Sequence, residues 1–363
     1  MLTRSQIAFL AAFFLAIPAV ADAQLRTDKR LQEKVSIDVK DKPTEEFLRE
    51  LGEKYKLPID LDPEIRDVGP GEITLTADGI TLGSVIHLAC ESQGLIATME
   101  KGRLSIMSRD KDEQNLIVRD YPLAPLGPGI DPQTLSVGLT ELTSGFWKDV
   151  DGEGGEIAAI NPQTFRIRQT RFVHAELQSV FDLITAANGR PRPPTVQDRS
   201  EQALLKKLNT PSQFSAEETP LLELLDQLLR KNGISYWVDT TGLSDEGINP
   251  LILNFKFAAS KKLSTAARLD AIAAEHQLSW TVADELVQIT SAAKADETMI
   301  NRLYDVRRAN VPAAALAEQM VRNKELGKWM IVDEEGGSIL PLGTSLLIRQ
   351  NGKGHAKIAR LLN

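Results

Sequence analysis

Alternating acidic residues precede two glycines in the stretch WKDVDGEGGEI, residues 147 to 157. Asp149, Asp151 and Glu153 stand at every second position, as the first ligands of a calcium-binding loop do. An EF-hand loop that began at Asp149 would need a glutamate at its twelfth position, where this chain has Ile160. A phosphate-binding Walker loop would need Gly-Lys-Ser/Thr after its glycines, and none follows. The remaining interpretation is a tight turn.

The same stretch occurs a second time in the chain, as part of a longer internal repeat. IRQTRFVHAEL, from Ile167, matches IRQNGKGHAKI, from Ile348, at five of eleven positions. The offset between matching segments drifts only between 177 and 183 residues, as small loop insertions and deletions produce. The positions shared by the two copies are Pro43 with Pro220, Tyr121 with Tyr304, Trp147 with Trp329, Gly154 with Gly336, Gly155 with Gly337, and His174 with His355.

The repeat decides how the opening stretch is interpreted. The second copy keeps both glycines but has Ile331 where the first has Asp149, so the acidic set is not preserved. We therefore predict that Gly154 and Gly155 form a tight connection into a strand, where a positive φ is cheap only for glycine. All the shared positions are predicted to be structural.

The duplication predicts four small modules in the order A-B-A′-B′. Periodicity predicts β-α-β-β-α-β-β in A and β-α-β-β-α in B, so the fold class is α+β, a tandem duplication of two small two-layer modules. The predicted ranges are a signal peptide at 1–23, a flexible lead-in at 24–32, module A at 33–115, module B at 116–187, a Pro-rich linker at 188–204, module A′ at 205–296 and module B′ at 297–363. Because each core is modest, A is expected to pack on B and A′ on B′.

The N-terminus and the composition place the protein outside the cytoplasm. The apolar run from Ile7 to Val20 is followed by Ala21-Asp22-Ala23, which predicts cleavage before Gln24. An uncleaved anchor is the alternative, although a span needs about 20 apolar residues. A formal net charge of −8 argues against nucleic acid, whose phosphates are bound by Lys and Arg. The single cysteine, Cys90, excludes an internal disulfide.

No set of residues has the spacing of a catalytic or metal site. The four histidines form no cluster with metal-ligand spacing, and G-x-S-x-G is absent. The pairs Glu45-Glu46 and Glu334-Glu335 fit solvated surface. We predict no catalytic residues, no cofactor and no metal, and that the protein is not an enzyme. Trp147 and Trp329 fit a buried core role, with a binding platform as the alternative.

At this point the chain resembles a known family. VSIDVKDKPTEEFLREL with ITLTADGITLGSVIHLA, and FSAEETPLLELLDQLLRKNGISYWVD with LSTAARLDAIAAEHQLSWTV, resemble the short N-terminal domain shared by secretins and TonB-dependent receptors. Modules B and B′ are similar to the KH-like N-terminal modules of secretins, through the tyrosine strand, the IRQ strand and the helix led by histidine. Because the chain ends after B′, we expect it to lack the secretin pore domain. The resemblance implies a periplasmic binding or scaffolding module.

The sequence thus favours a non-enzymatic exported envelope protein that binds another envelope protein, through exposed sheet edges that accept a strand. One alternative is a glycan or peptidoglycan binder, which predicts exposed aromatic side chains at Trp147, Trp237, Trp280 or Trp329. A less favoured alternative is an envelope hydrolase with a carboxylate or histidine cluster between the halves. We expect no nucleic-acid partner and no membrane span after signal cleavage. The partner's identity and the oligomeric state stay open.

Overall fold

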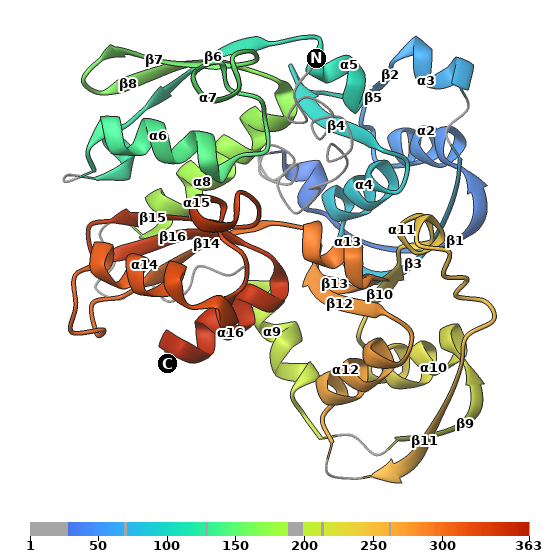
Figure 1. The fold of residues 1–363 in the computed structure, drawn as a ribbon. Coiled ribbons are helices and arrows are strands. Elements are labelled where there is room, and N and C mark those ends of the chain that lie inside the picture. Colours follow the sequence, from blue (N-terminus) through green and yellow to red (C-terminus); the bar gives the residue numbers. More distant parts are fainter. Residues whose placement is uncertain are drawn as a thin grey trace, which may run out of the picture.

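The computed structural model describes residues 28–68, 71–127, 130–187, 199–211, 214–260 and 263–362. The expected signal peptide at 1–23 and residues 188–198 of the expected linker lie outside these ranges. The described chain has an α+β fold, as predicted, in which small sheets carry packed helices (Figure 1). We use the names A, B, A′ and B′ for four units that are defined by their elements below.

The first copy of the repeat comprises units A and B. Unit A contains a 3₁₀ turn at Lys29–Gln32, β1 (Lys34–Pro43), α2 (Thr44–Lys54), β2 (Ile59–Leu61), α3 (Pro63–Val68), β3 (Glu72–Thr81), α4 (Leu82–Glu91), β4 (Leu95–Glu100), β5 (Arg103–Ser108) and α5 (Arg109–Glu113). Unit B contains β6 (Ile117–Pro122), α6 (Pro132–Leu142), α7 (Lys148–Asp151), β7 (Glu156–Asn161), β8 (Thr164–Gln169) and α8 (Arg171–Ala187). In unit A the short helix α3 stands between two strands, where the sequence predicted none.

The second copy repeats these elements. Unit A′ contains α9 (Arg199–Leu208), β9 (Phe214–Pro220), α10 (Leu221–Leu228), β10 (Tyr236–Val238), α11 (Thr240–Asp245), β11 (Asn254–Ser260), α12 (Thr265–Glu275), β12 (Leu278–Ala283), β13 (Leu286–Ser291) and α13 (Ala292–Glu297). Unit B′ contains β14 (Ile300–Asp305), α14 (Ala313–Arg322), α15 (Met330–Asp333), β15 (Ser338–Leu342), β16 (Ser345–Gln350) and α16 (Gly352–Leu362).

The sheets of the two copies have the same topology. Units A and A′ each combine a two-stranded antiparallel ribbon, β1-β3 or β11-β9, with a mixed three-stranded sheet, in the order β2-β5-β4 or β10-β13-β12. Units B and B′ each have an antiparallel three-stranded sheet, in the order β6-β8-β7 or β14-β16-β15. In every three-stranded sheet, the strand that comes last in the sequence therefore lies in the middle, and the strand before it in the sequence forms one edge.

The described part of the expected flexible lead-in is ordered, which corrects that prediction for residues 28–32. Leu31 is fully buried in the core of unit A. The Arg30 guanidinium donates hydrogen bonds to the Lys56 and Gly102 carbonyl oxygens, each at 3.0 Å. One apolar side chain and one anchored arginine hold the segment, whereas the sequence showed only charged neighbours.

The expected linker also needs correction, because helix α9 begins at Arg199 rather than after residue 204. Leu204 and Leu208 are buried in the hydrophobic core of unit A′. Residues four positions apart lie on one face of a helix, so this pair gives α9 an apolar face. The Pro-rich and charged residues upstream obscured that short amphipathic pattern.

The two copies share hydrophobic cores across the duplication. Trp237 and Leu286 of unit A′ belong to the core of unit A, and Leu303 and Leu347 of unit B′ belong to the core of unit B. Figure 1 shows helices α6 and α8 of unit B between the sheet of B above and the sheet of B′ below. The sheet of B′ thus packs on the helices of B, and the sheet of A′ packs on unit A, where β10 contacts β3.

Units A and B also contact each other, through Ile96 of unit A in the core of unit B and through a polar junction. The buried Asp112 carboxylate accepts hydrogen bonds from the backbone N–H groups of Arg171, at 3.1 Å, and Phe172, at 2.9 Å. These two residues begin α8, so the carboxylate binds the unpaired donors of a helix N-terminus. The cores shared between the copies and this contact between A and B together join the four units.

One residue exchange explains why the second-copy sheets are covered. In unit B, Asp120 faces Arg166 across the strand pair and forms an exposed ion pair, with side chains 45% and 52% exposed. At the same register in unit B′, Leu303 faces Leu347, and they are 3% and 0% exposed. Two leucines make the sheet face apolar enough to bury, whereas an ion pair keeps it in water.

The same exchange occurs between units A and A′. Asp60 and Arg103 form an exposed ion pair across β2 and β5. The corresponding places on β10 and β13 hold Trp237 and Leu286, which are buried against unit A. The outer sheet faces of A and B therefore stay solvated, while those of A′ and B′ are covered.

Candidate protein-binding edge

The two repeated tryptophans are buried at equivalent places in units B and B′. Trp147 and Trp329 are 2% and 1% exposed, and each pairs with the second glycine of its copy, Gly155 or Gly337. The Asp151 carboxylate accepts the Trp147 N–H at 2.7 Å, and the second copy repeats this contact with its own aspartate. Asp151 therefore acts as a hydrogen-bond acceptor within the turn.

The first glycine of each pair adopts a conformation that disfavours other residues. Gly154 has a φ of +99°, and Gly336 has a φ of +100°. A Cβ atom on Gly154 would lie 2.3 Å from the Phe146 carbonyl oxygen. The turn that follows Trp147 thus needs glycine both for its φ and for the close backbone approach.

We expect Gly154→Ala to lower the free energy of unfolding by more than about 3 kcal/mol, because strain and a backbone clash combine. Gly152→Ala is the matched control: its φ is +82°, but no atom lies within 4 Å of the added Cβ. The control should lose only about 1 kcal/mol. Urea unfolding of both variants checks this, and equal losses would contradict the steric argument.

The repeated tyrosines and histidines form buried pairs. In unit B the His174 Nδ1 lies 2.8 Å from the Tyr121 hydroxyl, and Nε2 lies 3.0 Å from the Ile117 carbonyl oxygen. Unit B′ repeats this with Tyr304 and His355, at 2.8 Å for the hydroxyl. The Ile117 carbonyl oxygen can only accept, so Nε2 carries a proton, and the Tyr121 hydroxyl lies within reach of both Nδ1 and the His174 carbonyl oxygen, at 3.2 Å. Each pair ties the last helix to the first strand of its unit.

The repeated prolines occupy one strand–helix junction in each copy. Pro43 ends β1 and precedes α2, and Pro220 ends β9 and precedes α10. Proline's fixed φ suits a helix start, and the end of a strand tolerates its missing N–H. The shared positions are thus distributed through the cores and junctions of four units. They do not converge on one site.

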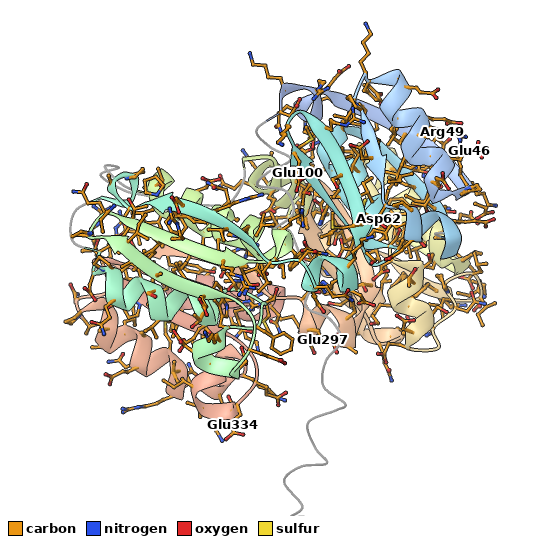
Figure 2. The ribbon with its side chains drawn as sticks, turned by 90° about the horizontal axis from the view of Figure 1, so that it is seen from above. Glu46, Arg49, Asp62, Glu100, Glu297 and Glu334 are labelled. Atoms are coloured by element: carbon orange, nitrogen blue, oxygen red, sulfur yellow. The ribbon has the colours of Figure 1, made fainter. Side chains whose placement is uncertain are left out.

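The candidate for binding is instead the outer edge of unit B, strand β7. Within the described residues, β7 is hydrogen-bonded to β8 and forms an edge of its sheet. Ala158, Ala159 and Ile160 are exposed on it. Seen from above, the strands of unit B lie uppermost on the left of the molecule (Figure 2). An edge strand offers a row of backbone N–H and C=O groups that another chain can pair with.

Comparison with unit B′ shows that β7, which carries one charged residue at its start, Glu156, lacks the proline that protects β15. Proteins protect edge strands with proline or with charged side chains. Pro341 stands in β15 opposite Leu346, and at the same register Ala159 stands in β7 opposite Phe165. Proline has no N–H, so it fits where the N–H would point away from the sheet. From this register we expect the Ala159 N–H to point to the free edge, although the pairing of β7 becomes irregular between Ala159 and Asn161.

The surface beside this edge combines apolar and charged side chains. Val118 and Ile160 are 55% and 44% exposed. The ion pair of Asp120 with Arg166 joins the other edge strand, β6, to the central strand, β8, on which Arg168 is also exposed. Such a mixed surface suits reversible binding of a segment whose side chains alternate between apolar and polar.

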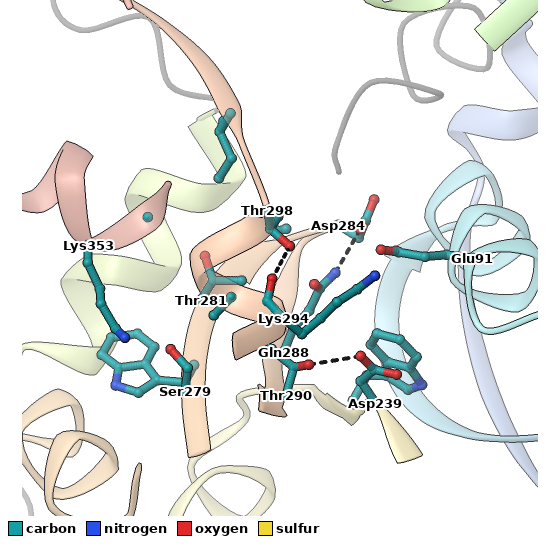
Figure 3. Close-up of a pocket in the computed structure, with 16 residues that line it drawn as sticks. Glu91, Asp239, Ser279, Thr281, Asp284, Gln288, Thr290, Lys294, Thr298 and Lys353 are labelled. Atoms are coloured by element: carbon teal, nitrogen blue, oxygen red, sulfur yellow. Dashed lines mark hydrogen bonds between the residues drawn. The ribbon is translucent and has the colours of Figure 1, made fainter. Parts of the chain in front are cut away.

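A second cluster of polar residues lies where units A, A′ and B′ meet, around a cavity of about 50 Å³ (Figure 3). Glu91, Asp239, Asp284 and Lys294 line it. Burial raises the pKa of Glu91 to about 7 and lowers the pKa of Lys294. Small-molecule sites commonly have roughly 300 to 1,000 Å³, so this cavity has room for water or an ion rather than for a polymer.

Sequence reasoning missed this cluster. Its signal was His87 four residues before Glu91 on a helix, which places both side chains on one face. The third member, Asp284, is 197 residues away from His87 along the chain. Only the packing of A′ on A brings it there.

Comparisons with known proteins give structural neighbours only. No family model and no curated protein sequence matches the chain. The N-terminal domain of the secretin XcpQ from Pseudomonas aeruginosa matches at 12% identity, over 91% of this chain and 98% of that one, with a TM-score of 0.18. A chain of the Klebsiella pneumoniae type II secretion system outer membrane complex matches at 12% identity, over 90% and 49%, with a TM-score of 0.25.

A third neighbour is the enterotoxigenic Escherichia coli GspC–GspD complex from the type II secretion system. It matches at 14% identity over 43% of this chain and 100% of that chain, with a TM-score of 0.18. Because these identities and TM-scores are low, we derive the function from the chain's own geometry. Among the helices of the described ranges, none is long and apolar enough to cross a membrane.

Proposed function

We propose that this chain is a non-enzymatic exported envelope protein that binds another protein by adding a strand of that partner to β7. The observation that carries the proposal is the unprotected edge at Ala159, at the register where the second copy has Pro341. Backbone pairing along β7 supplies affinity, and the alternating side chains of the partner strand supply specificity.

We further propose that A and A′ are modules like the short N-terminal domain of secretins, at 33–115 and 205–296, and that B and B′ are their KH-like modules, at 116–187 and 297–363. The support is that each element order and each sheet order occurs twice. In this arrangement A, A′ and B′ serve as a scaffold that presents the edge of B.

The glycan-binding alternative predicted exposed tryptophans. Trp147, Trp237 and Trp329 are buried in hydrophobic cores, and the Trp280 indole is half-buried beside the cavity, where it donates to Asp270 at 2.9 Å. The hydrolase alternative predicted a cluster between the halves. A cluster exists there, but its cavity holds no room for a polymer substrate.

The test is Ala159→Pro, compared with Ala159→Ser. Proline removes the N–H that pairs with a partner strand, whereas serine keeps it. Because unit B′ tolerates proline at this register, the free energy of unfolding should change by less than about 1 kcal/mol. We expect photo-crosslinking from position 160 in intact cells to capture a specific envelope protein with the serine variant.

The proline variant should lose at least tenfold of that capture. Equal capture of the same protein by the proline and serine variants would contradict strand addition at β7. Failure of both variants and of the unsubstituted chain to capture any protein would overturn the binding function itself.

A further inference from the structure

His87, Glu91 and Asp284 form a compact group at the junction of units A and A′. His87 and Glu91 lie one turn apart on α4, and Asp284 lies in the hairpin turn between β12 and β13. The His87 Nδ1 lies 3.1 Å from an Asp284 carboxylate oxygen and 4.0 Å from a Glu91 carboxylate oxygen. All three ligand atoms lie within 4.8 Å of one another.

These separations suit a tetrahedral metal ion. Zinc binds imidazole nitrogen and carboxylate oxygen at about 2.0 to 2.2 Å, so neighbouring ligand atoms in a tetrahedral site lie roughly 3.4 Å apart. The two separations from His87 lie on either side of that value. Small side-chain rotations would bring the three atoms to one centre.

The hairpin turn that carries Asp284 is fixed before any ion binds. Asp284 and Glu285 have φ values of +50° and +66°, while the same turn in unit A has Lys101 followed by glycine. Glu285 accepts the Thr81 N–H at 2.5 Å and forms an ion pair with Lys34. Contacts of Glu285 with unit A therefore hold Asp284 against α4, although this turn type favours glycine.

The charges around the group are unbalanced without a cation. Among the residues that line the cavity, Glu91, Asp239 and Asp284 contribute three carboxylates, and Lys294 and Lys353 contribute two ammonium groups (Figure 3). Asp284 accepts a hydrogen bond from Gln288, and Asp239 accepts one from Thr290. For Glu91, the contact found among the described residues is His87 at 4.0 Å, which is longer than a hydrogen bond.

A divalent cation would offset the excess of carboxylates and bind the Glu91 carboxylate. The cavity of about 50 Å³ is lined by Glu91 and Asp284, and a water needs only about 10 to 15 Å³ of such volume. A water in the cavity can therefore complete a four-coordinate site that has three protein ligands.

We propose that His87, Glu91 and Asp284 bind a zinc-like divalent transition-metal ion that joins unit A to unit A′. Imidazole nitrogen with two carboxylates favours such an ion over calcium, which takes six to eight oxygen ligands. Because two ligands come from A and one from A′, the ion acts on the junction between the copies. This site is separate from the strand-binding edge and does not depend on it.

The test uses the full mature chain without a histidine tag, stripped with a chelator and titrated with Co²⁺. We expect one equivalent of Co²⁺ to give the visible absorption of a four-coordinate ion, and Zn²⁺ to displace it. Zn²⁺ should also raise the melting temperature, because it binds the folded state. The isosteric variants Glu91→Gln and Asp284→Asn should each weaken Co²⁺ binding at least tenfold.

Asp239→Asn is the matched control, since this carboxylate lines the same cavity but lies outside the three ligands. It should change Co²⁺ affinity by less than threefold. Circular dichroism shows whether each ligand variant folds. If one does not, the Co²⁺ spectrum and the Zn²⁺-dependent change in melting temperature of the unsubstituted chain still test the proposal. Absence of the four-coordinate spectrum, or retention of it in folded Glu91→Gln and Asp284→Asn variants, would overturn the proposal.

Discussion

Replacing Leu303 by aspartate and Leu347 by arginine should lower the free energy of unfolding by more than about 4 kcal/mol. This double substitution gives unit B′ the cross-strand ion pair that unit B has at the same register. Two buried leucines would lose their apolar contacts, and two charges would be desolvated beneath α6 and α8. Urea unfolding measures the loss, and limited proteolysis should show cleavage of B′ before B.

The converse exchange is the matched control. Asp120→Leu with Arg166→Leu makes the outer face of unit B apolar, but this face is exposed, so stability should change by less than about 1 kcal/mol. A loss below 1 kcal/mol in the Leu303→Asp, Leu347→Arg variant would show that the B–B′ contact contributes little. Equal losses in both variants would show that the strand pair, and not its burial, matters.

This exchange also defines where the arrangement ends. The sheet of B′ packs on the helices of B, and the sheet of A′ packs on the core of A, so each contact joins two different surfaces. Contacts of that type can continue indefinitely unless something stops them. The ion pairs Asp60–Arg103 and Asp120–Arg166 keep the outer sheet faces of A and B in water. No further unit is therefore expected to pack on the outer sheet face of A or of B, and the edge strand β7 of unit B stays accessible.

The sequence was sufficient to predict the α+β class, because the periodicity of short strands and helices is local. It also predicted the duplication, since Trp147 and its glycines repeat at a fixed spacing. The equivalent strands of units B and B′ already differ in sequence: TFRIR in B carries a charge where LLIR in B′ has leucine. This difference indicates that the sheet face of B′ is buried against the first copy. The expectation that A packs on B and A′ on B′ rests only on the modest size of each core, which does not indicate which surfaces are apolar enough to be covered.

Other features depend on contacts between distant segments and have no local signal. Nothing near His87 indicates that Asp284 will lie 3.1 Å away, since the docking of one hairpin turn decides it. Leu31 is ordered by a core that the following residues build. The helix at Arg199 is stabilised by the core of A′ more than by its own propensity.

Acidification should destabilise the protein through two of its buried histidines, His174 and His355. Burial lowers the pKa of His174 to about 4 and that of His355 to about 3, whereas both titrate near 6.5 in the unfolded chain. At a pH between the folded and the unfolded pKa of each histidine, the unfolded chain binds a proton that the folded chain does not. Stability is therefore complete above about pH 6.5 and falls as the pH decreases, by up to about 3 kcal/mol for His174 and about 5 kcal/mol for His355.

The measurement is urea unfolding between pH 7.5 and pH 4.5 for the unsubstituted chain and for His174→Gln. Glutamine does not titrate. The difference in free energy of unfolding between the unsubstituted chain and His174→Gln should therefore shrink by about 2 to 3 kcal/mol as the pH falls from 7.5 to 4.5. Comparing pairs at each pH cancels groups that act in the opposite direction, such as Glu91, whose pKa is raised by burial.

Tyr121→Phe is the control for this experiment, because it removes the hydroxyl that donates to His174 but keeps the buried imidazole. It should lower stability by a similar amount at each pH. A His174→Gln variant with the same pH dependence as the unsubstituted chain would show that the pKa of His174 is the same in the folded and the unfolded protein. The Tyr121–His174 pair would then lie in a more polar environment than its burial implies.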